Sequence, residues 1–203
     1  MQKNNKTMKT DIILSGVGGQ GILSIATVIG EAAMKENLYL KQAEVHGMSQ
    51  RGGDVQSNLR ISSSPIYSDL IPLGKADLII SLEPMEALRY IQYLSEDGWI
   101  ITNSTPFINI PNYPPIENIL GEIKSVRNHV IIDIDAIAKQ VASPRTSNIV
   151  LLGAAAPFVG LESNKLEEGI KAIFERKGEN VVEMNLKAFR AGLDYSLKAR
   201  NNG

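Results

Sequence analysis

The 203-residue sequence contains no cysteine. It therefore cannot form a disulfide, ligate an iron–sulfur cluster through thiolates, build a thiolate zinc site or supply a cysteine nucleophile. Its two histidines, His46 and His129, are far apart in the sequence and belong to no ligand pattern. The sequence thus predicts no metal site and no catalytic residue, and any redox centre of these kinds would have to lie on another chain.

The sequence also lacks an excess of charge of either sign, with 21 Lys and Arg against 22 Asp and Glu. Without a basic run of five or more residues, it is not typical of a protein that neutralises many phosphates, so we expect no nucleic-acid role.

The longest nearly apolar run, 149–161, contains Pro157 and is shorter than the about 18–20 residues that cross a bilayer. Residues 1–9 are polar and make a poor signal peptide. We expect a cytoplasmic protein with a disordered tail over 1–9 and one domain over 10–203.

Short β-branched runs and helical periodicities alternate along the chain. Apolar runs predict strands at 11–15, 38–45, 54–61, 76–81, 99–103 and 130–133. Apolar residues at helical spacing predict helices at 20–37 and 84–95, and helical structure throughout from about residue 146. Because strands that alternate with helices pair in parallel through crossovers, we predict an α/β fold. It is a Rossmann-like, doubly wound, mostly parallel sheet flanked by helices, with a helical C-terminal part. Four prolines over 105–115 predict a loop.

A glycine turn joins the first predicted strand to the first predicted helix. It comprises Gly16, Val17, Gly18, Gly19, Gln20 and Gly21. Glycines at the first, third and sixth positions match GxGxxG, in which glycine permits the tight turn and the close approach of the backbone. Free N–H groups at the helix start favour an anion such as a pyrophosphate or carboxylate. The alternative is that the glycines only let the helix pack tightly on the strand.

A nicotinamide cofactor would need an acidic residue about 20 residues further on, at the end of the second strand. Glu44 occupies about this position. This leaves open an NAD(P)-binding oxidoreductase, with a solvated carboxylate as the equally acceptable interpretation of Glu44.

A second loop, His46–Gly53, combines glycines with polar donors. Its candidate site residues are His46, Ser49, Gln50, Arg51, Gly52 and Gly53. Flexible backbone N–H groups beside Ser, Gln and Arg side chains suit a carboxylate or phosphate at the carboxyl edge of a sheet. We therefore expect this loop to face the same crevice as the glycine turn, although a plain connection would also account for the glycines. Nothing in the sequence orients His46 as a general base.

Four stretches together resemble a known family. They are GVGGQGI at 16–22, EVHGMSQRGGDVQSNLRIS at 44–62, ADLIISLEPMEALR at 76–89 and NIVLLGAAAPFVG at 148–160. They are similar to the small gamma-type subunit of 2-oxoacid:ferredoxin oxidoreductases, and most similar to the beta subunits of the indolepyruvate enzymes. The resemblance covers about residues 10–197, and the stretch over 44–53 is more specific than the glycine turn.

The resemblance implies an accessory subunit without a complete active site of its own. In that family the assembled enzyme decarboxylates a 2-oxoacid on thiamine diphosphate, transfers the acyl group to coenzyme A and passes electrons through iron–sulfur clusters to ferredoxin. Thiamine diphosphate, Mg and the clusters would lie on a large partner subunit, which agrees with the absence of cysteine here. The family implies no NAD.

The resemblance also places the contacts with ligand or partner in the two loops. Gly18, Gly19 and Gly21 would donate backbone N–H groups and Arg51 would pair with charge. The residues expected to orient the ligand or the partner surface are Gln20, Ser49 and Gln50.

Overall fold

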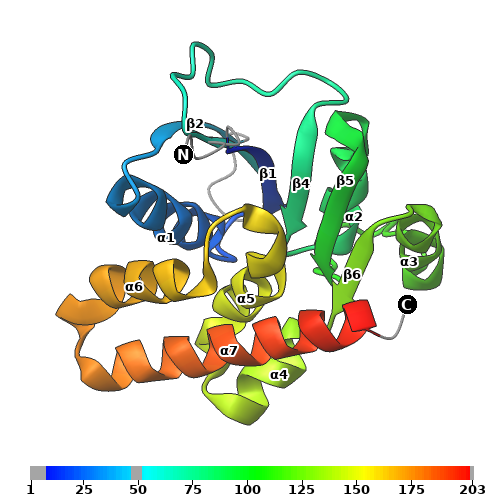
Figure 1. The fold of residues 1–203 in the computed structure, drawn as a ribbon. Helices are drawn as coiled ribbons and strands as arrows, with labels where there is room; N and C mark the ends of the chain where they lie inside the picture. Colours follow the sequence, from blue (N-terminus) through cyan, green and yellow to red (C-terminus); the bar gives the residue numbers. More distant parts are fainter. Residues whose placement is uncertain (1–7, 47–51, 202–203) are drawn as a thin grey trace.

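The computed structural model describes residues 8–46 and 52–201, and the predicted tail lies mostly outside them. Within these residues a six-stranded sheet carries helices on both faces (Figure 1). The strands are β1 (Lys9–Val17), β2 (Tyr39–His46), β3 (Asp54–Ser62), β4 (Ala76–Ser81), β5 (Leu94–Asn103) and β6 (His129–Ile132). The α-helices are α1 (Ile22–Lys35), α2 (Pro84–Arg89), α3 (Ile116–Ser125), α4 (Ile134–Val141), α5 (Ser147–Val159), α6 (Ser163–Phe174) and α7 (Glu179–Asn201). Short 3-10 turns are η1 (Ile91–Tyr93), η2 (Pro144–Thr146) and η3 (Glu175–Lys177).

The sheet order is β2-β3-β1-β4-β5-β6, and all strands except β3 run in the same direction. The predicted mostly parallel, helix-flanked sheet is therefore confirmed. The parallel pairing does not extend to β3, which is antiparallel to both β2 and β1. Only residues 47–53 connect β2 to β3, and a parallel crossover needs a dozen or more residues. The connection is thus a hairpin, and it inserts β3 between β2 and β1.

Alternate side chains of the strands enter two separate cores. In β1, Ile12 and Leu14 pack with α1 and with α4–α7 on one face, whereas Ile13 packs with α2 and α3 on the other. This is the period of two that a strand buried on both faces requires. The larger layer of helices therefore lies on the face that carries the C-terminal part of the chain.

Helix α5 lies at the centre of that layer and is apolar nearly all round. It crosses α7 at two glycines: a Cβ atom on Gly153 would overlap the carbonyl oxygen of Phe189, and one on Gly192 would overlap that of Val150. The two helix backbones therefore touch directly. Such an approach is open only to glycine at these positions.

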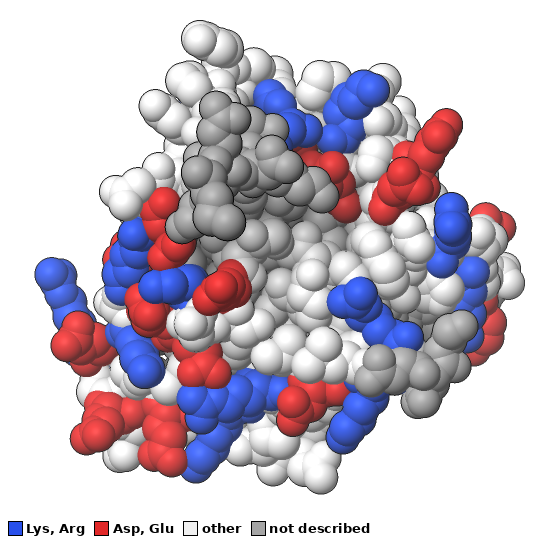
Figure 2. Space-filling model, in the orientation of Figure 1, with Lys and Arg blue, Asp and Glu red and all other residues white. Residues whose placement is uncertain are grey.

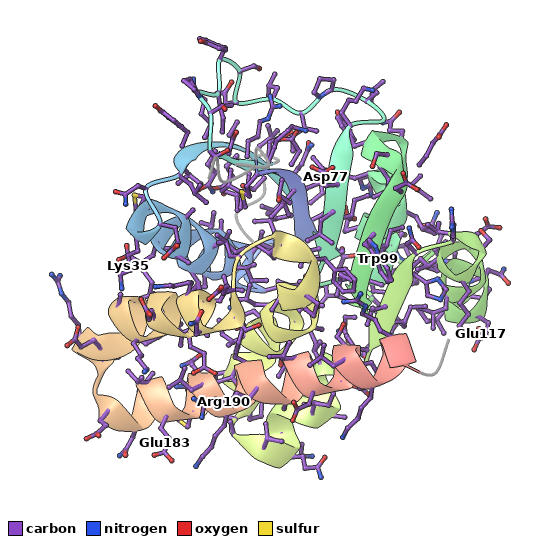
Figure 3. The ribbon with its side chains drawn as sticks, viewed as in Figure 1. Lys35, Asp77, Trp99, Glu117, Glu183 and Arg190 are labelled. Carbon is purple, nitrogen blue, oxygen red and sulfur yellow. The ribbon has the colours of Figure 1, made fainter. Side chains whose placement is uncertain are left out.

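Helices α6 and α7 form the outer part of the layer. Basic and acidic side chains alternate along this face instead of forming a patch of one sign (Figure 2). Arg190 of α7 donates to both carboxylate oxygens of Glu167 on α6, at 2.7 and 2.6 Å (Figure 3). The Arg190 guanidinium lowers the pKa of the Glu167 carboxyl. The pair links the two helices at the surface.

Three sequence predictions need correction. The helix expected over 84–95 ends at Arg89, because η1 turns the chain and β5 already begins at Leu94. Strand β1 begins at Lys9, within the predicted tail over 1–9. Helices α3 and α4 were not predicted, although Ile116, Ile119 and Ile123 have helical spacing.

The predicted loop over 105–115 contains neither helix nor strand. Among the described residues, no helix is both long and apolar enough to cross a bilayer.

Candidate functional site

The glycine turn lies between β1 and α1, as predicted. Gly21 caps the helix in the left-handed region at φ 90°, and Gly19 has φ 100°. Gly16 permits a close approach, because a Cβ atom there would lie 3.0 Å from Ile22 Cδ1 and 3.2 Å from Leu82 Cβ. The turn thus requires glycine both for its backbone conformation and for its packing.

Gln20 holds the turn together through its side-chain amide. Its Oε1 accepts a 2.7 Å hydrogen bond from the Val17 N–H, and its Nε2 donates to the Leu82 carbonyl at 3.4 Å. Both polar ends of the side chain therefore bind backbone, which gives Gln20 a positioning role within the turn.

The second loop begins and ends beside the glycine turn. The Gly18 N–H donates a 2.8 Å hydrogen bond to the Gly53 carbonyl, and Gly16 pairs with Val55 across the β1–β3 ladder. The backbone of His46 pairs with the same Val55 from the other side. Ser49, Gln50 and Arg51 lie outside the described residues. The described ends of the loop are therefore at the same edge of the sheet as the glycine turn.

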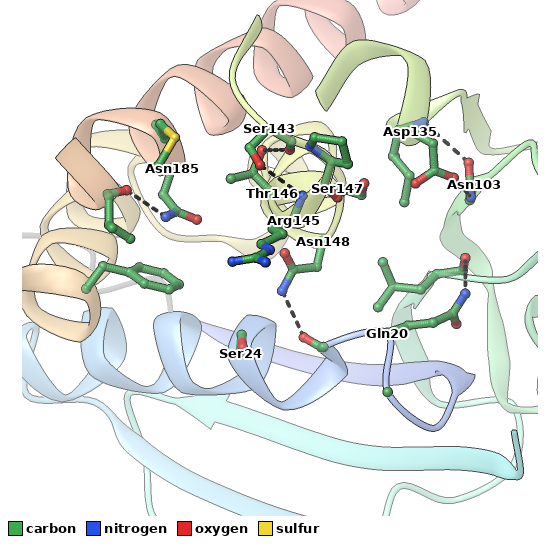
Figure 4. Close-up of a pocket in the computed structure, with 18 of the residues that line it drawn as sticks. Gln20, Ser24, Asn103, Asp135, Ser143, Arg145, Thr146, Ser147, Asn148 and Asn185 are labelled. Atoms are coloured by element: carbon green, nitrogen blue, oxygen red, sulfur yellow. Dashed lines mark hydrogen bonds between the residues drawn. The ribbon is translucent and has the colours of Figure 1, made fainter. Parts of the chain in front are cut away.

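A cavity of about 730 Å³ opens at this edge, beyond the carboxyl ends of β1, β4 and β5 (Figure 4). After β1 the chain forms β2 and β3 on one side of that strand, and then β4, β5 and β6 on the other side. The cavity therefore lies at the point where the strand order reverses. Ligands of open α/β sheets bind at such points. Gly19, Gln20 and Gly21 form one wall. The opposite walls come from the start of α4, residues 143–148 and the start of α7.

Asn148, at the start of α5, connects the glycine turn to the rest of the cavity. Its Nδ2 donates to the Gly21 carbonyl at 3.1 Å, and a Cβ atom on Gly21 would lie 2.7 Å from this same nitrogen. The N-termini of α1 and α5 therefore point into one cavity. The positive end of a helix dipole lies at its N-terminus, so this end of the cavity favours anions.

Several polar side chains of the cavity were not found by sequence reasoning. They are Ser24, Arg145, Thr146, Asn148, Lys177 and Asn185. Arg145 and Lys177 are exposed cations, whereas Asn148 and Asn185 are buried. Asn148 begins the stretch 148–160 that carries part of the family resemblance, but that resemblance gives it no role. Ser24 follows the glycine turn in sequence, whereas the fold brings the other five residues to it.

A buried acidic cluster lies on the other face of the sheet, at the start of α2. Glu83 accepts hydrogen bonds from the Tyr113 hydroxyl and the Glu86 N–H, and Glu86 pairs with Arg89. Burial raises the pKa of Tyr113, helped by its bond to the Glu83 carboxylate. Burial also raises the pKa of Tyr90 to about 12, with Asp54 contributing. Every carboxylate here has a protein partner, so the cluster anchors the proline-rich loop.

NAD(P) binding would require an acidic residue at the end of a strand adjacent to β1. Glu44 lies on β2. Because β3 separates β2 from β1, Glu44 lies two strand spacings, or about 10 Å, from β1, the strand that leads into the glycine turn. In the dinucleotide-binding arrangement the two strands are adjacent. The geometry therefore does not favour the nicotinamide alternative.

The described residues include no group of three or more His, Asp or Glu side chains that could hold a metal ion. They also include no thiolate, since the whole chain lacks cysteine. The residues present thus do not fit an iron–sulfur cluster.

Comparison with known proteins identifies relatives that share this fold along nearly the whole chain. The chain is 35% identical over 200 residues to the indolepyruvate oxidoreductase subunit IorB of Archaeoglobus fulgidus, covering 95% of this chain and 98% of that protein. The gamma subunit of a keto/oxoacid ferredoxin oxidoreductase from Geobacter sulfurreducens superimposes with a TM-score of 0.67 at 26% identity, covering 93% of this chain and 99% of that one.

A larger enzyme shares the fold. The 2-oxoglutarate:ferredoxin oxidoreductase from Magnetococcus marinus superimposes with a TM-score of 0.74 at 22% identity, over 94% of this chain but only 31% of that one. The Pyruvate ferredoxin/flavodoxin oxidoreductase family model matches residues 11–195. With nearly the whole chain matched, the protein belongs to the pyruvate ferredoxin/flavodoxin oxidoreductase family.

Proposed function

We propose that this chain is the small subunit of an indolepyruvate:ferredoxin oxidoreductase. The observation that carries the proposal is the end-to-end similarity to the Archaeoglobus fulgidus indolepyruvate oxidoreductase subunit, which includes the glycine turn and the second loop. A large partner subunit in the cytoplasm would hold thiamine diphosphate, Mg and the iron–sulfur clusters and reduce ferredoxin. Coenzyme A would be the co-substrate, as it is bound, with succinyl-CoA, in the Magnetococcus marinus enzyme.

The proposed role of the sheet edge is to complete a site on the partner. The Gly18–Gly53 hydrogen bond supports this role because it joins the glycine turn to the end of the second loop. Backbone N–H groups of Gly19 and Gly21 would face ligand or partner, and Arg51 would supply a positive charge. Ser49 and Gln50 would orient the same surface, while Gln20 keeps the turn in shape.

The direct test is co-expression with the thiamine-dependent large subunit, followed by an assay of 2-oxoacid-dependent viologen reduction. We expect indolepyruvate to be preferred to pyruvate and 2-oxoglutarate, and activity to fall at least about tenfold without this chain. Full activity without the chain would exclude the proposal. Preference for another 2-oxoacid would exclude only the indolepyruvate assignment.

Gly19→Ala tests the glycine turn within the assembled enzyme. A Cβ atom on Gly19 meets nothing within 4 Å, but the residue has φ 100°, so the change strains the turn without a clash. Gly74→Ala is the matched control, since Gly74 also has a positive φ and open space but lies in the loop before β4. We expect Gly19→Ala alone to raise the KM or weaken assembly. Equal effects of both variants would contradict a role for the turn.

A further inference from the structure

We propose that the proline-rich loop, residues 105–115, is a docking surface for the large subunit, with Phe107, Ile108 and Ile110 as its apolar contacts. The proposal rests on the proposed function, because the occupant it names is the chain that would complete the site at this edge of the sheet. It adds where on this chain the contact lies and which side chains make it.

Three large apolar side chains of this loop are exposed. Phe107, Ile108 and Ile110 are 45%, 70% and 38% exposed. The sequence has no charged residue between Asp97 and Glu117, so no charge accompanies them along the loop. The centres of protein interfaces are likewise poor in charge and rich in aromatic and apolar side chains, and clustered apolar exposure marks such sites. The loop therefore has the composition of an interface.

The loop is held in place at several points although it contains neither helix nor strand. At its start, the Thr105 carbonyl accepts a 3.2 Å hydrogen bond from Asn103 Nδ2. The Phe107 N–H donates to the buried Glu83 carboxylate at 3.3 Å, and the Tyr113 hydroxyl donates to the same carboxylate oxygen. An ordered backbone thus carries the exposed side chains. A surface that is already ordered loses little conformational entropy on binding, which favours association.

The position of the loop identifies its occupant. Asn109 Nδ2 donates a 2.6 Å hydrogen bond to the Gly52 carbonyl, and the next carbonyl, that of Gly53, accepts from the Gly18 N–H. These two bonds join the proline-rich loop, the end of the second loop and the glycine turn into one continuous surface. A large subunit that covers the glycine turn and the second loop therefore also meets the proline-rich loop.

Another exposed loop shows that apolar exposure alone does not identify the surface. Residues 63–75 join β3 to β4 and include Leu73, which is 59% exposed. Because β3 is antiparallel to β1, this loop starts beside the first residues of β1, at the sheet edge opposite the glycine turn. It also carries the charged residues Asp69 and Lys75. Leu73 therefore provides a control of similar chemistry and exposure away from the proposed contact.

A single introduced thiol tests whether the large subunit covers the loop. Because the chain has no cysteine, Ile108→Cys and Leu73→Cys each create its only thiol. Each full chain is treated with iodoacetamide, alone and in complex with the large subunit, and its alkylation is followed by mass spectrometry. We expect the complex to slow alkylation at position 108 at least about tenfold and to leave position 73 unchanged. Equal rates at position 108 with and without the large subunit would overturn the proposal.

Ile108→Ser tests whether the contact contributes to affinity, with Leu73→Ser as the matched control. Both side chains are exposed, so neither substitution empties the core. The large subunit is titrated with each full chain, and the concentration that gives half-maximal viologen reduction measures assembly. We expect Ile108→Ser to raise this concentration at least about tenfold and Leu73→Ser to raise it less than about twofold. Equal shifts would contradict a specific role for the proline-rich loop.

Failure of the proposed function and failure of this inference give different results. An unmodified chain that neither binds the large subunit nor raises its activity would exclude the proposed function and, with it, the occupant named here. Tight binding of the unmodified chain that Ile108→Ser does not weaken would overturn this inference alone. A dimer of the chain by itself, dissociated by Ile108→Ser in light scattering, would assign the loop to a second copy and would also overturn it.

Discussion

The backbone N–H of Gly18 donates a 2.8 Å hydrogen bond to the carbonyl oxygen of Gly53. The two residues belong to different connections, one between β1 and α1 and the other between β2 and β3. Their bond continues the β1–β3 ladder by one step past Val17 and Asp54. The glycine turn and the end of the second loop therefore form one continuous backbone surface at the edge of the cavity.

This bond predicts a difference in amide exchange. The Gly18 N–H has a partner, whereas the neighbouring Gly19 N–H has none among the described residues. We expect the Gly18 amide to exchange with deuterium at least about tenfold more slowly than that of Gly19, corrected for intrinsic rates. NMR of the full chain measures both rates. Equal rates would mean that the two loops are not joined in solution.

The contact between α5 and α7 predicts a large effect of a small substitution. Gly192→Ala places a methyl group against the Val150 carbonyl oxygen, so the helices must separate. Overpacking of this kind costs about 1–3 kcal/mol. Urea unfolding of the variant should show a corresponding loss of the free energy of unfolding.

Gly121→Ala on α3 is the matched control for that substitution. Its added Cβ meets nothing within 4 Å, so only helix propensity changes, and stability should rise by up to about 1 kcal/mol. Equal stability of Gly192→Ala and Gly121→Ala would contradict the close contact between α5 and α7.

The ion pair between the buried Asp11 and the partly exposed Arg60 predicts a strongly coupled loss. Asp11 is 1% exposed, and its two carboxylate oxygens accept from Arg60 at 2.8 and 3.0 Å. Arg60 also donates to the Ser68 and Leu70 carbonyls, which fixes the loop before β4. Asp11→Ala leaves the guanidinium without its carboxylate and should cost about 3–5 kcal/mol of unfolding free energy.

A double-mutant cycle with Arg60→Met measures that coupling, because the double variant should lose less than the sum of the single losses. Lys187→Gln serves as a comparison, since it breaks only an exposed pair with Glu183 and should change stability little. Additive losses for Asp11 and Arg60 would contradict the importance of their pairing.

The parts of the fold that follow local rules could be predicted from the sequence. The run Ile12–Ile13–Leu14 is apolar at every position because both faces of β1 are covered, and the adjacent glycines require the turn that follows. The short connection over 47–53 requires β3 to run antiparallel to β2, but the insertion of β3 beside β1 could not be predicted, since no local signal decides which strand pairs with the second edge of β3. Strand order depends on contacts between distant residues.

The polar residues of the cavity were beyond sequence reasoning for a similar reason. Asn148 meets the carbonyl of Gly21 across 127 residues of sequence. Asn185 lies within a helix whose local pattern is ordinary, and Arg145 follows a proline in a short turn. Isolated Asn and Arg residues are common on surfaces, so no local signal separates them from solvated side chains. Their shared position becomes apparent only when α5 and α7 pack beside the glycine turn.

Glu86 predicts the direction in which stability changes with pH. Burial raises its pKa above the ordinary 4.5, and this outweighs the lowering by Arg89, while Glu83 and Asp54 raise it further. Between pH 4.5 and the raised value, the folded state keeps a proton that the unfolded state has released. The contribution of Glu86 to stability is therefore greatest below pH 4.5 and declines as the pH rises through its folded pKa.

Glu86→Gln should remove this decline, because glutamine does not titrate yet can still accept from Arg89. Urea unfolding from pH 4.5 to 7 measures the slope of the unfolding free energy, which should become less negative in the variant. Glu183→Gln is the control: Lys187 lowers the pKa of Glu183, so its titration falls below pH 4.5 and the slope above that pH should not change. The same slope in Glu86→Gln and the unmodified chain would mean that burial does not disfavour the Glu86 carboxylate, and the packing around the start of α2 would have to be looser than described.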